Sequence, residues 1–384
     1  MEYLFNEEQK MIQLTCRRLV AEKIAPEAAK LDESGEFPKD TIELLAKQGL
    51  LGIVIPERYG GSQMGYLAFC LAIEEISKGC ASTADILGAH ALGCFPLVDF
   101  GTEEQKRRYL PSLSKGEKLA AFALTEPETG SDFSGTRTTA LREGNSYIIN
   151  GTKRFITNGG EADFYVVFAS TDPKKRLRGL SAFIVEKGEK GFEFGKKENK
   201  MGLRAAPTRE LLFSECRVPE RNLLGSLEMG SDIALSSVDQ GKPLIGAQAL
   251  GIAEAAFTAA FSYAQQRVQF GKPIIQHEGI QFMFSDMATE INAARLLVYH
   301  AAILKDKGLK FIKEAAMAKL YSSEMAHRVV HKALQIHGGY GYMKDYPIER
   351  YYRDQRITEI YEGTSEMQRL VVITLMLKGQ VSAP

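Results

Sequence analysis

The sequence predicts an α+β protein with a helical domain over residues 1–118, an antiparallel β-domain (a barrel or sandwich) over 119–225 and a helical bundle over 226–384. Three observations predict this order. Apolar residues recur near the start with the period of a helix, short apolar or alternating runs separated by turn residues fill the middle, and long segments with apolar residues at i, i+3 and i+4 follow. A chain of 384 residues is long enough for two or three packed units.

The first helix is expected to begin after Asn6, because an asparagine side chain can cap the free N–H groups of a helix start. Its apolar residues recur at roughly helical spacing, at Met11, Leu14, Leu19 and Val20, with Pro26 near its end. Further helices are expected over 39–48, over 67–78 and from Thr83, with a turn-rich loop over 56–65.

Five short runs in the middle of the chain are expected to be strands, over 120–124, 147–150, 164–169, 181–185 and 210–213. Turn residues such as Gly144-Asn145-Ser146 separate them, and Asn158-Gly159 is a candidate hairpin turn. No crossover helices lie between the runs, which favours an antiparallel sheet.

The last third of the chain is expected to be a bundle of long helices over 252–266, 281–304 and 311–336, with a final helix over 365–377. Lys307-Gly308 separates two of them. The Gly-rich GxGxxG loop of a doubly wound sheet is absent, so a dinucleotide would have to be held without it.

Composition excludes several classes of protein. Lys plus Arg (48) equals Asp plus Glu (48), so the net charge gives no indication of a nucleic-acid or membrane partner. The five cysteines form no CxxC pair, which is typical of unpaired thiols in a reducing compartment. We recognise no signal or transit peptide and expect no apolar stretch long enough to span a membrane, which together predict a cytoplasmic location.

Five segments combine turn formers with groups able to bind a ligand, at 122–132, 154–160, 267–281, 333–342 and 357–369. Each also has an ordinary structural explanation as a turn, a strand end or a helix end. Arg267, for example, could bind a pyrophosphate through its forked guanidinium. Glu362 and Glu366 could be acids that merely favour a helix N-terminus.

Taken together, the five segments resemble the acyl-CoA dehydrogenase family over essentially the whole chain. The resemblance implies a helical, β, helical fold, a tightly bound FAD, a homotetramer and an acyl-CoA substrate, with electrons passed to an electron-transfer flavoprotein. It implies no metal site. Two elements, RxxFG at Arg267 and QxxGG at Gln335, contact the FAD of a neighbouring subunit in this family.

The residues that match the family's motifs are assigned by this resemblance. Expected FAD contacts are Phe122, Leu124, Thr125, Gly130, Ser131, Phe155, Ile156, Thr157, Arg267, Gln269, Phe270, Gln335, Ile336, Gly338, Gly339, Thr364 and Glu366. Expected substrate contacts are Ser131, Asp239, Lys242 and Gly363.

The YEGTSE motif places the family's catalytic carboxylate at Glu362. Some branches carry the base near residue 241 instead, but this chain has Gly241 there, which favours Glu362. Lys242 stands where Arg is usual and loses the forked geometry, and Pro243 suggests a local kink.

The expected reaction is removal of the proton next to the thioester carbonyl by Glu362, with hydride loss from the next carbon, giving a 2-enoyl-CoA. Two alternatives are an oxidase that passes electrons to oxygen, whose chains are usually longer, and a flavin-binding scaffold without dehydrogenation. The intact Glu362 and the neutral net charge argue against the scaffold.

Asp85 is a second candidate catalytic residue, because the resemblance places the helix around it at the acyl end of the pocket. An unpaired acid in a pocket for alkyl chains is costly, so Asp85 could hydrogen-bond a polar group or act as a second base towards an alicyclic or functionalised acyl-CoA. Gly88 would leave room for a ring. In the alternative interpretation, Asp85 is a surface or capping acid turned away from the pocket.

Overall fold

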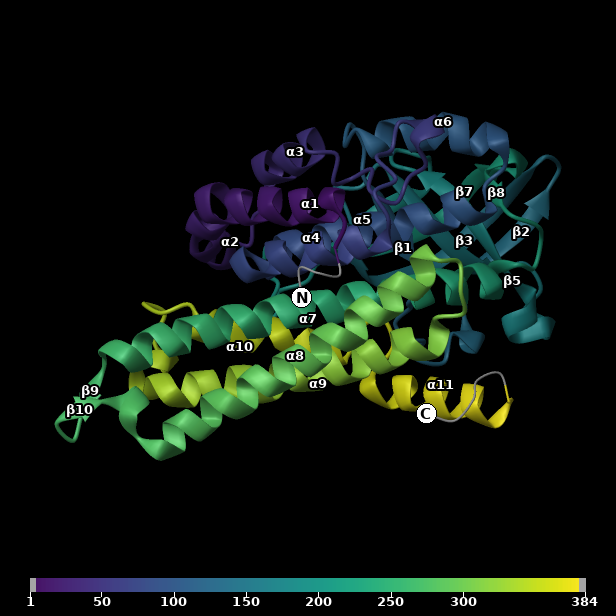
Figure 1. The fold of residues 1–384 in the computed structure, drawn as a ribbon. Helices are drawn as coiled ribbons and strands as arrows, with labels where there is room; N and C mark the ends of the chain where they lie inside the picture. The colour runs from purple at the N-terminus through teal and green to yellow at the C-terminus, as the bar shows by residue number, and fades with distance from the viewer. Residues whose placement is uncertain (1–4, 380–384) are drawn as a thin grey trace.

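The computed structural model describes residues 5–379 and has the predicted α+β architecture. Figure 1 shows the N-terminal helices lying along the long C-terminal helices, with the sheet at one end of both groups. The contact between the two helical groups is largest where α4 and α5 pack on α7. The site described below lies where these helices meet the sheet.

The N-terminal helices are α1 (Glu7–Leu19), α2 (Ala28–Ser34), α3 (Lys39–Lys47), α4 (Tyr66–Gly79), α5 (Ala81–Phe100) and α6 (Glu103–Ser114). Asn6 caps α1 as predicted, since its side chain accepts a hydrogen bond from the Gln9 N–H at 2.8 Å. The chain stays helical past Pro26, through a π turn and a 3₁₀ turn into α2. Sequence inspection missed α6, which carries Pro111 inside it.

The expected apolar stripe of α1 was partly wrong. Met11 and Leu14 are 68% and 63% exposed, whereas Ile12, Cys16 and Leu19 are buried. The helix has apolar residues on two sides, and only the side that faces α4 is covered. Spacing alone could not show which of the two sides meets the rest of the protein.

The expectation that no segment is long and apolar enough to span a membrane was also wrong. By length and composition α5 and α7 (Gly230–Gln266) both meet that description, but 83% and 67% of their most apolar windows are buried inside the protein. They are the central helices of the fold, and α5 contacts the sheet through β1.

The sheet consists of β1 (Ala120–Ala123), β2 (Thr139–Glu143), β3 (Ser146–Thr157), β4 (Phe164–Ser170), β5 (Leu180–Glu186), β6 (Phe192–Lys197), β7 (Thr208–Pro219) and β8 (Leu223–Leu224). Its strand order is β6-β7-β3-β2-β4-β5-β8, with β1 beside β4. All five predicted strands are present, whereas β2, β6 and the short β8 were missed.

The sheet is mostly antiparallel, as expected, but two of its pairings are parallel. β1 pairs with β4 in parallel, as does one residue pair between β2 and β4. The parallel pairing is possible because β1 enters the sheet from a helix rather than from a hairpin. Asn158 is likewise not a hairpin turn, because β3 pairs with β2 and β7 and not with β4. The buried Asn158 amide instead donates to the backbone oxygens of Ile86 and Ala120.

The C-terminal bundle consists of α7, α8 (Glu278–Asp306), α9 (Ile312–His337), α10 (Ile348–Gln355) and α11 (Ser365–Leu377). α7 begins well before the predicted start and is a single helix through Pro243. A short ribbon, β9 (Val268–Gln269) and β10 (Lys272–Pro273), joins α7 to α8 at the end farthest from the sheet (Figure 1). All five cysteines are buried and free.

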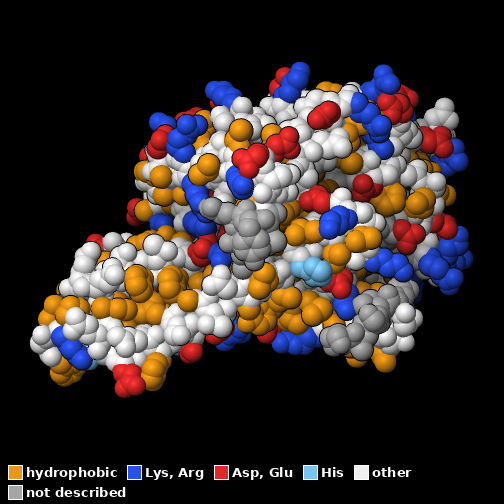
Figure 2. Space-filling model, in the orientation of Figure 1, with side chains coloured by type: hydrophobic (Ala, Val, Ile, Leu, Met, Phe, Trp, Pro, Cys, Tyr) orange, Lys and Arg blue, Asp and Glu red, His pale blue; other side chains and the backbone are white. Residues whose placement is uncertain are grey.

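Large apolar side chains are exposed on the bundle. Figure 2 shows hydrophobic side chains gathered over the long helices at the lower left. The most exposed residues near that end of the bundle are Val268, Phe270, Phe282, Tyr340 and Tyr342, with Phe270 94% exposed. Single exposed apolar residues are normal, but a group of this size is typical of a surface that another protein covers.

Candidate active site

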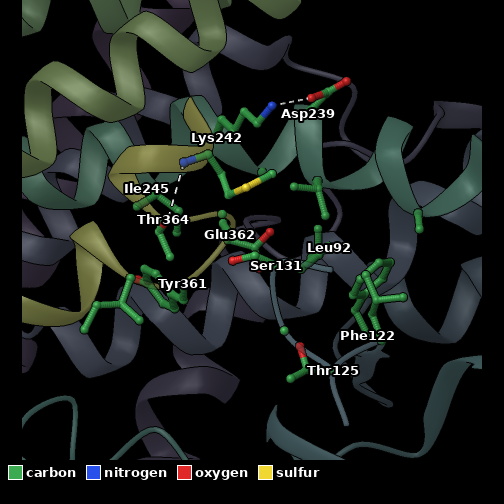
Figure 3. A pocket seen from close by; sticks show the side chains of 18 of the residues that line it. Leu92, Phe122, Thr125, Ser131, Asp239, Lys242, Ile245, Tyr361, Glu362 and Thr364 are labelled. Carbon is green, nitrogen blue, oxygen red and sulfur yellow. Dashed lines mark hydrogen bonds and ion pairs between the residues drawn. The ribbon is translucent and has the colours of Figure 1, made fainter. Parts of the chain in front are cut away.

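A cavity of about 1070 Å³ lies between the start of the sheet, α5, α7 and α11. Figure 3 shows Glu362 and Tyr361 from the loop before α11 facing into it, together with Leu92 from α5 and Ser131 from the segment after β1. The cavity brings together most of the predicted site residues: Asp85, Phe122, Leu124, Thr125, Gly130, Ser131, Phe155, Ile156, Thr157, Asp239, Lys242, Glu362, Gly363 and Thr364. Residues from all three parts of the chain therefore form one site.

Glu362 lies in the loop before α11 with a φ of 54°, a left-handed conformation that is uncommon for a non-glycine residue. Among the described residues, its buried Oε2 atom has no hydrogen-bond partner. Burial raises the pKa of Glu362 to about 7, with Lys319 opposing the shift and Asp85 adding to it. A carboxylate with this pKa is a stronger base than an exposed one, and about half of it is ionised near neutral pH.

Gly241 on α7 leaves the space that Glu362 occupies. A Cβ atom at this position would lie 3.2 Å from Glu362 Oε2, closer than most such contacts. The absence of a side chain at Gly241 therefore makes room for the carboxylate of Glu362.

Lys319 on α9 holds the loop that carries Glu362 in place. Its ammonium group is fully buried and donates to the Gly363 carbonyl oxygen at 2.7 Å. The Gln368 amide donates to the same oxygen at 2.8 Å. Burial lowers the pKa of Lys319 to about 8, against the opposing effect of Glu362. Sequence inspection missed Lys319, although a lysine among Ala315, Ala316 and other small residues on one helix face was a usable signal.

The segment from Phe122 to Ser131 forms one wall of the cavity. Buried polar contacts of Glu126 hold this segment in place. Glu126 and Lys153, both at most 3% exposed, form an ion pair of 2.7 Å, and Glu126 also accepts hydrogen bonds from the backbone N–H groups of Arg137 and Thr138. This network fixes the turn that follows β1.

This wall fits a flat aromatic cofactor. Phe155 turns towards the cavity with a φ of 58° and is 57% exposed, an unusual position for a large apolar ring. Gly130 has no atom within 4 Å of where a Cβ would stand, so its backbone is open to close approach. The buried Thr129 Oγ1 has no partner among the described residues.

Lys242 and Asp239 line the cavity one helical turn apart on α7, where their side chains form an ion pair (Figure 3). The Lys242 ammonium is therefore oriented by Asp239 at the cavity wall. Thr364 also lines the cavity and caps α11, with its hydroxyl accepting from the Met367 N–H at 3.3 Å.

The remaining predicted cofactor residues lie outside the cavity. They are Arg267, Gln269, Phe270, Gln335, Ile336, Gly338, Gly339 and Glu366. The RxxFG and QxxGG elements lie together, since the Arg267 guanidinium is 5.5 Å from the ring centre of Tyr340, next to Gly339. Ile336 is buried within the chain, so its side chain cannot reach a second subunit.

Asp85 is 8% exposed and lines the cavity from the interior of α5. The interpretation of Asp85 as a surface or capping acid turned away from the pocket is therefore wrong.

Models of three protein families match the chain in sequence: acyl-CoA dehydrogenase N-terminal domain over residues 6–117, middle domain over 121–216 and C-terminal domain over 228–377. An acyl-CoA dehydrogenase of Bacillus subtilis is 50% identical over 97% of this chain and 99% of its own length. A short-chain specific acyl-CoA dehydrogenase of Clostridium acetobutylicum is 47% identical over 97% of this chain and 98% of its own length.

Solved structures of acyl-CoA dehydrogenases are also similar to this chain. Butyryl-CoA dehydrogenase from Megasphaera elsdenii has a TM-score of 0.95 at 44% identity and covers 97% of this chain and 99% of its own. A chain in a structure of the electron transferring flavoprotein of Acidaminococcus fermentans has a TM-score of 0.97 at 46% identity, covering 98% and 100%. A Bacillus anthracis acyl-CoA dehydrogenase complexed with FAD has a TM-score of 0.93 at 37% identity, covering 98% and 68%.

Proposed function

The chain belongs to the acyl-CoA dehydrogenase family and is an FAD-dependent oxidoreductase acting on CH–CH bonds, and we propose that it oxidises short acyl-CoA thioesters to 2-enoyl-CoA products. The observation that carries the proposal is the Oε2 atom of Glu362, buried in a largely apolar cavity opposite Gly241 and without a hydrogen-bond partner in the part of the chain that the structure describes. The short chain length rests on the similarity to a short-chain specific enzyme and to a butyryl-CoA dehydrogenase.

In this proposal Glu362 removes the proton on the carbon next to the thioester carbonyl. Its raised pKa of about 7 makes it a stronger base than an ordinary carboxylate, and stabilisation of the developing enolate lowers the remaining barrier. The loop that presents Glu362 is held by Lys319 and Gln368, so the carboxylate does not have to be ordered when substrate binds. The Glu362 N–H is proposed to donate to the carbonyl oxygen as negative charge develops there.

FAD, when bound, supplies the acceptor for the hydride from the neighbouring carbon. Phe122, Leu124, Thr125, Phe155 and Thr157 are proposed to hold its ring system, together with Gly130, Ser131, Ile156 and Thr364. Glu366 lies outside the cavity, so its proposed contact is with a part of FAD beyond the ring system. Ser131, Asp239, Lys242 and Gly363 are proposed to contact the acyl-CoA. Lys242 would bring a positive charge to the CoA part of the substrate, oriented by Asp239.

We propose a homotetramer in which the end of the bundle completes a neighbour's FAD site. Arg267, Gln269, Phe270, Gln335 and the Gly338-Gly339 pair lie outside the cavity of their own chain. Apolar side chains surround them, with Phe270 94% and Tyr342 78% exposed. The buried Ile336 could contribute only through its backbone.

The proposed electron acceptor is an electron-transfer flavoprotein, since one similar chain was solved in a study of such a flavoprotein. The proposed location is the cytoplasm, as suggested by the bacterial relatives, although related short-chain enzymes of mammals are mitochondrial.

The test is oxidation of a series of saturated straight-chain acyl-CoAs by the purified, flavin-loaded enzyme, with an electron-transfer flavoprotein as acceptor. Four-carbon or five-carbon thioesters should give the highest kcat/KM and form 2-enoyl products. A preference for long chains would contradict the short-chain assignment, and no oxidation of any saturated thioester would contradict the proposed function itself.

A further inference from the structure

We propose that Asp85 is a positioning residue that keeps its proton in the working enzyme and donates it to the hydroxyl of Tyr361. Asp85, Tyr361 and Gln248 then form an uncharged chain of hydrogen bonds that anchors the loop carrying Glu362. This inference rests on the proposed function, because it gives Asp85 a part in orienting the proposed base.

Tyr361 joins the loop before α11 to two helices at the side of the cavity. Its hydroxyl donates to the side-chain oxygen of Gln248 on α7 and also forms a side-chain hydrogen bond with Asp85 on α5. Gln248 in turn donates from Nε2 to the Ala81 carbonyl oxygen at 3.1 Å. Ala81 and Asp85 are four residues apart on α5, so the chain of contacts leaves one face of this helix and returns to it.

The number of available hydrogens decides which group carries the proton. A tyrosine hydroxyl has one hydrogen, and the Gln248 oxygen can only accept it, since the Gln248 NH₂ group is turned to Ala81. With that hydrogen donated to Gln248, the bond between Tyr361 and Asp85 needs a hydrogen from Asp85. An ionised Asp85 would compete with Gln248 for the single hydrogen and leave one buried acceptor without a donor, which is costly.

Burial of Asp85 acts in the same direction. The side chain is 8% exposed in a largely apolar cavity, and burial raises its pKa although Lys200 and the bond with Tyr361 oppose the shift. Lys200 acts on Asp85 through its charge, while its ammonium group donates to the Ala206 carbonyl oxygen at 2.6 Å. The largest influence on Asp85 therefore favours its protonated form.

The chain of hydrogen bonds anchors one side of the loop that presents the base. Glu362 follows Tyr361 directly and has a left-handed φ of 54°, a conformation that persists only where its surroundings fix it. On the other side of Glu362, Lys319 and Gln368 hold the carbonyl oxygen of Gly363. The strained residue is thus held between two anchors, and Tyr361 is the one that reaches α5 and α7.

The protonation state of Asp85 also bears on the base itself. A negative charge on Asp85 raises the pKa of Glu362. A neutral replacement of Asp85 would therefore lower that pKa if Asp85 is ionised, and would leave it unchanged if Asp85 already carries its proton. A protonated Asp85 cannot accept a proton from the substrate, so in this proposal it is not a second base.

The test compares the flavin-loaded wild type with Asp85→Asn. Asparagine is uncharged and keeps an N–H donor for Tyr361, so kcat/KM for a short acyl-CoA should rise with pH through the same midpoint as in the wild type. A lower midpoint in Asp85→Asn would overturn the inference.

Infrared spectra of the same two proteins at mildly alkaline pH give a readout that needs no turnover. The wild type minus Asp85→Asn should show the carbonyl stretch of a protonated carboxyl group. The stretches of a carboxylate in its place would overturn the inference. An ionised Asp85 in an enzyme that oxidises short acyl-CoAs would leave the proposed function intact.

Asp85→Leu and Tyr361→Phe each break the chain at one bond. Each should lower kcat by about threefold to tenfold, the loss expected for one hydrogen bond, and the double variant should lose no more than either one. Tyr59→Phe is the matched control, since the buried Tyr59 donates to Glu103 at 2.7 Å and neither residue lines the cavity. Multiplied losses in the double variant, or an equal loss in Tyr59→Phe, would overturn the inference.

Discussion

The ammonium group of Lys319 donates a hydrogen bond to the carbonyl oxygen of Gly363 at 2.7 Å, so a buried cation on α9 fixes the residue that follows Glu362. The same cation lowers the pKa of Glu362 against the effect of burial. Lys319 thus positions the loop and also limits how far the pKa of its carboxylate rises.

We expect Lys319→Met to shift the pH dependence of the reaction. Glu362 acts as a base only when ionised, so kcat/KM rises with pH through its pKa, near 7 in the wild type. Without the nearby positive charge that pKa rises, and the rise in kcat/KM moves to higher pH. The measurement is a kcat/KM profile between acidic and mildly alkaline pH, with flavin content as a check on folding.

Lys332→Met on the same helix is the control, because Lys332 pairs with Asp286 and Glu290 rather than with the site. An unchanged profile for Lys319→Met with reduced activity would show a purely structural role. Restoration of the wild-type profile by Lys319→Arg would support the electrostatic account.

Gly241→Ala should impair the reaction without disturbing the fold. The added Cβ would stand 3.2 Å from Glu362 Oε2 and displace the carboxylate by a fraction of an ångström. We expect a loss of kcat of about tenfold, less than the ~10²-fold typical of a full ångström of misplacement. Steady-state kinetics would measure the loss of activity, and a thermal melt would show whether the fold is intact. Wild-type activity in the variant would contradict the close packing of Gly241 against Glu362.

Lys153→Met should destabilise the protein and weaken cofactor retention. It leaves the Glu126 carboxylate buried without its partner, which typically costs about 3–5 kcal/mol. Removing the exposed pair of Arg217 and Glu143 by Arg217→Met should cost at most ~1 kcal/mol. Urea unfolding and flavin release on warming would measure both variants. Equal small effects would show that the buried pair does not hold the wall of the cavity.

Phe270→Asp should dissociate the proposed tetramer and lower its FAD content together. Phe270 is 94% exposed at the tip of the bundle, so a charge at this position should not destabilise the core of its own chain. The measurements are sedimentation or light scattering for mass and absorbance for bound flavin. A variant that becomes a monomer but keeps full flavin content would refute a shared site.

The sequence predicted the order of helices and strands because caps, turns and periodicity are local. Asn6 caps α1 as expected, and α11 has the predicted bounds. The parallel pairing of β1 with β4 and the exposed side of α1 depend on which distant elements meet, which no local pattern contains.

The site was predictable where a motif carries it and not elsewhere. The motifs around Thr125, Thr157 and Glu362 led to one cavity. Lys319 belongs to no motif, and its importance comes only from what the fold places beside it. For Asp85 the helix was expected at the pocket, but whether its carboxyl faces the cavity became visible only from the fold.

The most direct test of the account is anaerobic mixing of a short saturated acyl-CoA with the wild type and with Glu362→Gln, while the visible absorbance of the bound flavin is recorded. The amide keeps the size of the side chain but cannot accept the proton. We predict rapid bleaching in the wild type, and bleaching slower by at least ~10²-fold in Glu362→Gln with its full flavin content retained. Bleaching of the variant at the wild-type rate would contradict Glu362 as the base.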